Sequence, residues 1–111
     1  MKLKNERTKK VVSHNVFEAK SLRERLFGLV GKDGKKSLLL HTRFGIHTFG
    51  MPRPIDVLVL DQQNRVIKLR SNLPPNRIFL WNPKYSTVIE LPEGTIERTD
   101  VKLGDAVLTS K

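Results

Sequence analysis

The stretch from His47 to Asp61, HTFGMPRPIDVLVLD, constrains the fold more than any other part of this chain. Pro52 and Pro54 exclude an ordinary helix or a central strand at their own positions, and they impose a stiff, extended path. Residues 55–60 are apolar except for one acid, are rich in β-branched side chains, and are bounded by polar residues. That length and those boundaries predict a buried strand.

Side chains alternate along a strand, so residues 55, 57 and 59 are expected on one face and 56, 58 and 60 on the other. Both faces are apolar, as in the middle of a covered sheet, and Asp56 is the exception. A carboxylate that enters a core must be paired or hydrogen-bonded, because a bare buried charge costs several kcal/mol. We favour a structural acid that ties down the turn from Met51 to Pro54; the alternative is a residue of a functional site.

The 111 residues suffice for one modest core. We expect a flexible basic lead-in over residues 1–10 and one globular domain over residues 11–111. No apolar run could span a membrane, and no apolar segment follows the charged start as in a secretory leader. The chain has no cysteine, which excludes disulfides and thiolate chemistry. These features predict a soluble, cytoplasmic protein.

The net charge of +10 is distributed unevenly. Residues 1–36 hold eleven Lys or Arg against four acids, whereas residues 37–111 hold ten against seven, so the excess is +7 in the first part and +3 in the second. Such a field attracts nucleic acid or another anionic surface. Phe17 and Phe27, the aromatic residues of this basic third, are expected in the core, which argues against a dedicated nucleic-acid module.

The rest of the chain reads as short strands joined by turns, with a capped helix from Ser21 and one helical turn over Thr95 to Thr99. The connection from Ser71 to Lys84 is unusually long, and we expect it to be functional or packed as a lid, with Trp81 against the body. The fold class predicted is α+β and β-rich, a compact, mainly antiparallel sheet or small barrel of about six strands with one or two short helices. The strands expected besides residues 55–60 are residues 11–19, 37–42, 65–70, 86–91 and 102–109.

Three groups of residues resemble one family in their order and spacing. Glu24-Arg25 with Gly28-Leu29-Val30-Gly31 is similar to that family's E-R-x-x-G-L-M motif. Residues 47–51, 54–56 and 60–61 are similar to its F-W-M-x-N…L-D…F-L-D core, and residues 88–91 with Gly94 and Gly104-Asp105 to its V-L-E-L…G…G-D ending. The chain thus resembles the domain-of-unknown-function 192 family, small proteins of bacteria and archaea, over residues 20–109.

The resemblance implies a compact β-rich fold and supplies no established activity. This chain has Gly50 where the family's aromatic residue precedes the methionine, and Pro52-Arg53 where the family has Lys-Asn. If the central loop of the family binds a ligand, these departures predict a different ligand here. Some relatives carry export signals, and no such signal is expected in this chain.

Arg25, Asp56 and Glu90 are the charged residues that fall within the matching motifs. We predict that at least one of the two acids pairs with Arg25 across the core and fixes the helix to the sheet, a role that suits a guanidinium and a carboxylate. The two acids could instead form a general acid/base pair, as in glycoside hydrolysis. His41, His47 and Asp56 lack the tight spacing of a dedicated metal site, so no metal is predicted. The sequence names neither a catalytic residue nor a cofactor.

The leading hypothesis is a non-catalytic binding or interaction module. Its pocket would lie between the His47–Pro54 loop and the connection over residues 71–84, for a ligand or protein partner that the sequence does not identify. A second hypothesis is a small hydrolase or metal-dependent enzyme that uses His47, Asp56 and Glu90. A third is weak nucleic-acid binding by the basic N-terminal third. The binding residues predicted for the leading hypothesis are His47, Phe49, Met51, Arg53, Asp56 and Trp81.

Overall fold

The computed structural model describes residues 1–19 and 36–110, and these residues form ten strands and one short helix. The helix predicted from Ser21 and the residue Arg25 lie outside the described residues. The described elements are β1 (Lys2–Asn5), β2 (Val11–Ser13), β3 (Val16–Glu18), β4 (Ser37–His41), β5 (Gly45–His47), β6 (Ile55–Leu60), β7 (Val66–Leu73), β8 (Ile78–Leu80), β9 (Thr87–Pro92), α2 (Thr95–Thr99) and β10 (Val107–Ser110).

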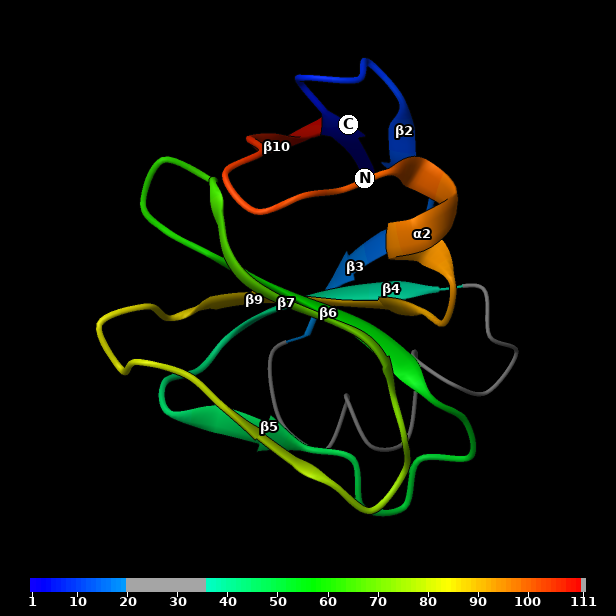
Figure 1. The fold of residues 1–111 in the computed structure, drawn as a ribbon, viewed down its shortest axis with the longest axis vertical. Helices are drawn as coiled ribbons and strands as arrows, with labels where there is room; N and C mark the ends of the chain where they lie inside the picture. Colours follow the sequence, from blue (N-terminus) through cyan, green and yellow to red (C-terminus); the bar gives the residue numbers. More distant parts are fainter. Residues whose placement is uncertain (20–35, 111) are drawn as a thin grey trace.

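A five-stranded sheet in the order β3-β4-β9-β6-β7 forms the middle of the molecule (Figure 1). Its strands pair antiparallel except for β3 and β4, which run parallel. The predicted hairpin is confirmed, because β6 pairs antiparallel with β7. The predicted α+β, β-rich class is also confirmed, and the described strands form three separate sheets that do not close into a barrel.

β6 lies between two neighbouring strands, and all six of its residues are buried, as predicted. The sheet of β10, β1 and β2, together with α2, covers one face of the central sheet, and the β5–β8 pair covers the other (Figure 1). Leu58 and Leu60 belong to the first hydrophobic core, whereas Ile55, Val57 and Val59 belong to the second. Each such side chain stabilises the fold by roughly 1.5–3 kcal/mol.

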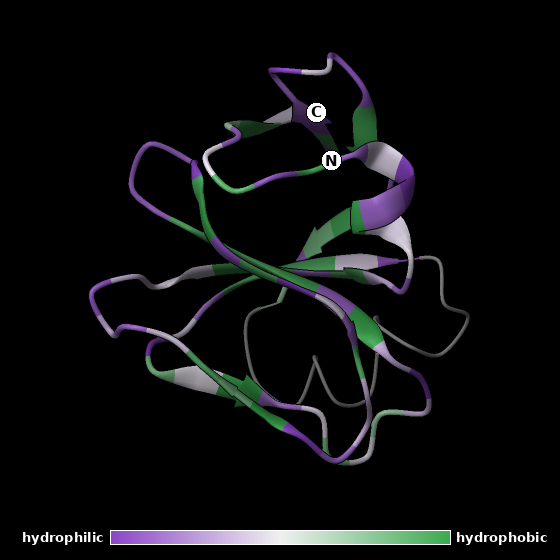
Figure 2. Cartoon of the chain, in the orientation of Figure 1, coloured by the Kyte–Doolittle hydropathy of each residue, from purple (hydrophilic) through white to green (hydrophobic). Residues whose placement is uncertain are grey.

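The hydropathy of the chain follows this layering. Hydrophobic residues concentrate in the central strands, and hydrophilic residues in the turns at the periphery (Figure 2). No helix among the described residues is long and apolar enough to cross a bilayer.

The prediction of a flexible lead-in over residues 1–10 is partly wrong, because residues 2–5 form β1. This strand pairs with both β10 and β2, and it buries Leu3 and Asn5. The alternation of Lys2, Leu3, Lys4 and Asn5 is a two-residue pattern with one buried face, which the abundance of lysine obscured.

Two further segments differ from their predictions. The strand expected over residues 11–19 is two strands, β2 and β3, which belong to different sheets. The stretch over residues 71–84, expected to be a long connection, contains the end of β7 and the whole of β8. The helical turn predicted at residues 95–99 is confirmed as α2.

Candidate functional site

The two-stranded sheet of β5 and β8 carries the candidate site. Ile46 pairs with Phe79, and both side chains point inward into the second core. Because side chains alternate along a strand, Ile78 and Leu80 point away from the core, where they are 63% and 60% exposed. The apolar residues of β8 therefore lie on two faces: Phe79 packs in the core, whereas Ile78 and Leu80 lie on the surface.

Phe44, immediately before β5, is 66% exposed and has a φ of 73°. The N–H of Gly45 donates to the carbonyl of Arg43 at 2.9 Å, so Phe44 is the central residue of a three-residue turn. Its own carbonyl accepts the N–H of Trp81 at 2.9 Å, which fixes this turn to the end of β8. The left-handed region is unfavourable for a phenylalanine, so the fold holds this aromatic ring on the surface at the expense of local backbone strain.

Thr48, the residue after β5, joins the two segments that were predicted to flank a pocket. Its buried hydroxyl donates to the carbonyl of Pro74 at 2.7 Å and accepts the N–H of Arg77 at 2.8 Å. The rings of His47 and Phe49 on either side of it stack with centroids 5.0 Å apart, and the N–H of Phe49 donates to Nδ1 of His47 at 3.2 Å. Thr48 thus anchors the loop, while the half-buried His47 and the exposed Phe49 form a stacked aromatic pair on either side of it.

A shallow groove of about 340 Å³ lies on the outer side of this pair of strands. Its floor is β5, and exposed apolar side chains form its walls. We call this surface the β5–β8 groove. Its lining residues are Thr42, Arg43, Phe44, Gly45, Ile46, His47, Phe49, Ile78 and Leu80.

Of the six predicted binding residues, the structure brings His47 and Phe49 to this groove. Met51 and Trp81 are buried instead, and Trp81 packs in the second core with its indole N–H donating to the carbonyl of Tyr85 at 2.8 Å. Arg53 is exposed but does not line the groove. The packing expected for Trp81 is confirmed, whereas a place for Trp81 in the groove is not.

Asp56 lies on the opposite side of the central sheet, facing α2. Its Oδ2 accepts the N–H of Ile96 at 2.8 Å, and its Oδ1 accepts the N–H of Asn72 at 2.9 Å. The structural interpretation of this acid is therefore supported, but with different partners: it anchors α2 and β7, whereas we expected it to tie down the Met51–Pro54 turn.

Asp56 and Glu90 cannot act as a catalytic pair. In the register of β6 with β9, Asp56 is opposite Leu91 and Val57 is opposite Glu90, so the two carboxylates point to opposite faces of one sheet. Glu90, fully buried, shares its face with Val88 of the second core. The pairing of either acid with Arg25 stays a prediction, since Arg25 lies outside the described residues.

No cluster of three or more His, Cys, Asp or Glu side chains that could hold a metal occurs within residues 1–19 and 36–110. His41 lies beside Glu18 at 3.8 Å, an exposed contact on the edge of the central sheet, and His47 is in the groove. The three residues considered for a metal site, His41, His47 and Asp56, therefore occupy different surroundings.

Sequence reasoning missed Phe44, Ile78 and Leu80 as groove residues. The signal was the run Ile78-Phe79-Leu80-Trp81, which is apolar on both faces of a strand although it lies in a segment interpreted as a connection. Phe17, expected in the core, is exposed, with Nζ of Lys36 5.7 Å from its ring centroid.

Comparison with known proteins places the chain among uncharacterised relatives. The model of the DUF192 family, described as an uncharacterized ACR, matches residues 2–109. A UPF0127 protein of Pyrococcus horikoshii is 34% identical over 95 residues, which cover 80% of this chain and 82% of the relative.

Two solved structures share the fold. A protein of unknown function from Novosphingobium aromaticivorans superposes with a TM-score of 0.73 at 15% identity, covering 97% of this chain and 82% of that one. A protein of Sinorhizobium meliloti, whose description as a transcription regulator is provisional, gives a TM-score of 0.72 at 19% identity, with 96% and 89% covered. At these identities the likeness concerns the fold alone.

Proposed function

The chain belongs to the DUF192 family of uncharacterised proteins, and from that premise we propose that it is a non-catalytic binding module whose contact surface is the β5–β8 groove. The observation that carries this proposal is the exposure of four large apolar side chains around one small pair of strands. They are Phe44, Phe49, Ile78 and Leu80, between 47% and 66% exposed.

Single apolar residues on a surface need no explanation, but a contiguous apolar patch is typical of an interaction site. Here the patch is concave, so it suits an apolar side chain inserted by a partner better than a flat contact. The strained turn at Phe44 supports the same interpretation, because strain concentrates where a side chain is held for function.

The hydrolase alternative loses its acid/base pair, because Asp56 and Glu90 lie on opposite faces of the central sheet. Both oxygens of Asp56 already accept backbone N–H groups, which suits a structural role. A binding function needs no such pair, and the groove supplies an aromatic pair, aliphatic walls and one cation at its edge.

The test replaces groove side chains without touching the core. Ile78→Ser and Leu80→Ser remove exposed apolar groups, and Leu103→Ser, at an exposed leucine outside the groove, is the matched control. Fluorescence of 8-anilinonaphthalene-1-sulfonate should fall several-fold in the groove variants and stay at the wild-type level in the control. Peptides selected from a display library should lose binding in the same two variants only.

Unchanged dye fluorescence and peptide binding in both groove variants would overturn the proposal. Thermal unfolding measured in parallel should stay close to wild type, since substitutions of exposed residues usually change stability by less than about 0.5 kcal/mol. A loss of binding that accompanies a loss of folding would also count against the proposal, because it would mean that Ile78 and Leu80 stabilise the fold.

A further inference from the structure

The two segments that form the β5–β8 layer contain cations and no acids. Residues 42–54 include Arg43 and Arg53, residues 74–86 include Arg77 and Lys84, and neither range contains Asp or Glu. A fifth cation, Lys68 of β7 in the central sheet, contacts the end of β8. Within residues 1–19 and 36–110, none of these five cations forms an ion pair.

Neutral carbonyl groups hold two of these cations beside the groove. Nη1 of Arg43 donates to the carbonyl of Pro83 at 2.8 Å, and Nζ of Lys68 donates to the carbonyl of Leu80 at 2.6 Å. Lys68 also lies 4.9 Å from the ring centroid of Phe79. A carbonyl accepts a hydrogen bond from a cation without neutralising its charge, so Arg43, which lines the groove, keeps its positive potential beside whatever enters it.

We infer that the occupant of the β5–β8 groove is an acidic segment of a partner protein. In this segment an apolar residue, whose side chain enters the groove, is flanked by acidic residues. This inference rests on the proposed binding function and adds the charge of the partner. The apolar walls would bury the inserted side chain, and the surrounding cations would meet the flanking carboxylates, where complementary charge raises the association rate and the specificity.

A second copy of this chain fits the groove poorly, because two layers whose segments each carry four cations and no acids would repel one another across a two-fold axis. A single-stranded nucleic acid would need open aromatic faces on which to stack its bases. In the groove His47 and Phe49 stack on each other, Phe44 is a single exposed ring, and the walls formed by Ile78 and Leu80 are aliphatic. A protein segment therefore fits these walls better than a strand of bases.

The experiment measures the affinity of the protein for three fluorescent peptides by anisotropy. In the first peptide, leucine and phenylalanine are flanked by glutamates. In the second and third peptides, glutamines or lysines replace these glutamates. The glutamate peptide should bind about tenfold tighter than the glutamine peptide at low ionic strength, and added salt should reduce this preference. The lysine peptide should bind most weakly.

Arg43→Glu should abolish the preference for glutamate, whereas Arg98→Glu, on the exposed surface of α2, should preserve it. Both variants change the net charge by the same amount, so the comparison separates a local contact from the overall field. A preserved preference in Arg43→Glu would overturn the inference.

The outcomes distinguish the inference from the proposed function. Equal binding of the glutamate and glutamine peptides that is lost in Ile78→Ser would overturn the inference and leave the binding function standing. Failure of all three peptides, together with unchanged dye fluorescence in the groove variants, would overturn both. Tighter binding of oligothymidylate or of phosphatidylglycerol vesicles, abolished by Arg43→Glu, would overturn the assignment to a protein segment.

Discussion

The carboxylate of Asp56 accepts the N–H of Ile96 at 2.8 Å, so a residue of the central strand caps a helix that begins almost forty residues later. Gly94, the residue at the N-cap position of α2, has no side chain with which to cap. The second oxygen of Asp56 accepts the N–H of Asn72 at 2.9 Å. One buried acid therefore joins β6, β7 and α2, and this explains why an acid interrupts an otherwise apolar strand.

Asp56→Asn is expected to lower the free energy of unfolding by about 1–3 kcal/mol, because the amide group of asparagine faces a backbone N–H where the second carboxylate oxygen was. The measurement is urea unfolding followed by the fluorescence of Trp81. Hydrogen exchange should quicken most at the amides of Ile96 and Asn72, whose acceptor is changed.

The control for this substitution is Asp61→Asn in the turn between β6 and β7. Oδ1 of Asp61 also accepts two backbone N–H groups, from Gln63 and Arg65, but these bonds lie at the surface. Water can replace them, so the loss should stay below about 1 kcal/mol. An equal loss of unfolding free energy in both variants would mean that the burial of Asp56 does not increase the stability that its hydrogen bonds contribute.

Phe44→Asn should stabilise the fold and weaken binding at the same time. Three asparagines of this chain, Asn64, Asn72 and Asn76, have positive φ values like that of Phe44, and asparagine tolerates this region better than phenylalanine. We expect the free energy of unfolding to rise by about 0.5–1 kcal/mol. Affinity for a groove ligand should fall on the order of fivefold, because an exposed aromatic wall is lost.

Thermal unfolding and peptide anisotropy, measured on the same preparation, test both effects of Phe44→Asn. A gain in stability without a loss of affinity would show that Phe44 is strained for a reason other than binding. A loss of stability would show that the ring of Phe44 packs on the β5–β8 pair more closely than its exposed fraction indicates.

Gly45→Ala should destabilise the β5–β8 pair, because the added methyl group would clash with atoms of β8 that cannot move aside. A Cβ at this position would lie 2.5 Å from the carbonyl oxygen of Phe79 and 2.7 Å from a methyl group of Leu80. The oxygen belongs to the backbone of the paired strand, so the strands must separate, and we expect a loss of about 2–3 kcal/mol in urea unfolding.

Gly50→Ala separates this steric effect from a conformational one. Nothing lies within 4 Å of a Cβ at Gly50, but its φ is 81°. Its substitution should therefore cost only the strain of a left-handed alanine, about 1 kcal/mol. Dye fluorescence from the groove should fall in Gly45→Ala and persist in Gly50→Ala; the reverse order would contradict the assigned geometry.

The sequence predicted β6 well because the pattern around it is local: Pro54 fixes the entry, and the apolar run has the length of one strand. It predicted the hairpin to β7 and the helical turn of α2 for the same reason. It could not predict the partners of Asp56, because Asn72 and Ile96 come near this acid only when three elements pack together. A periodic pattern identifies a buried position but not the element that covers it.

The candidate site was predicted in part. The chain does bring the loop after His47 beside the connection over residues 71–84, through the pairing of β5 with β8 and the bonds of Thr48. However, residue type alone suggested Met51 and Trp81 as residues that line the pocket, whereas both are buried, Trp81 in the second core. Exposure of Ile78 and Leu80 depends on which face of a three-residue strand meets the core, and so short a strand carries no periodicity from which to infer it.

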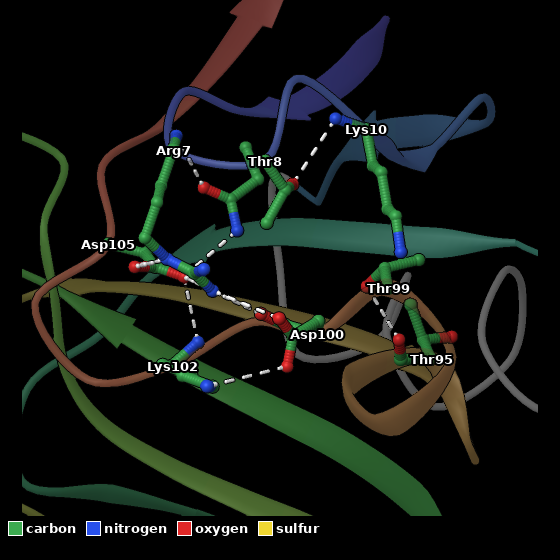
Figure 3. A network of polar contacts seen from close by, with 9 residues as sticks. Arg7, Thr8, Lys10, Thr95, Thr99, Asp100, Lys102 and Asp105 are labelled. Atoms are coloured by element: carbon green, nitrogen blue, oxygen red, sulfur yellow. Dashed lines mark hydrogen bonds and ion pairs between the residues drawn. The ribbon is translucent and has the colours of Figure 1, made fainter.

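Stability should fall in acid because of the contacts of Asp105 with Asn5 at the end of β1 and with Arg7 in the turn that follows it (Figure 3). Nε of Arg7 donates to this carboxylate at 2.7 Å and Nδ2 of Asn5 at 2.9 Å, and the bond from Arg7 is the main cause that lowers the pKa of Asp105 from 3.8 to about 2. The unfolded chain therefore takes up the proton at a higher pH than the folded chain. The stabilisation is complete above the unfolded pKa of 3.8 and is lost as the pH falls through about 2.

After allowance for solvent screening at the half-exposed Arg7, the acid-dependent loss from Asp105 should be on the order of 1–2 kcal/mol. Urea unfolding at a series of pH values between neutrality and the folded pKa measures it. Asp105→Asn should be less stable near neutrality and should flatten this part of the curve, since asparagine does not titrate. An equally steep curve in Asp105→Asn would contradict the assignment of this acid sensitivity to Asp105.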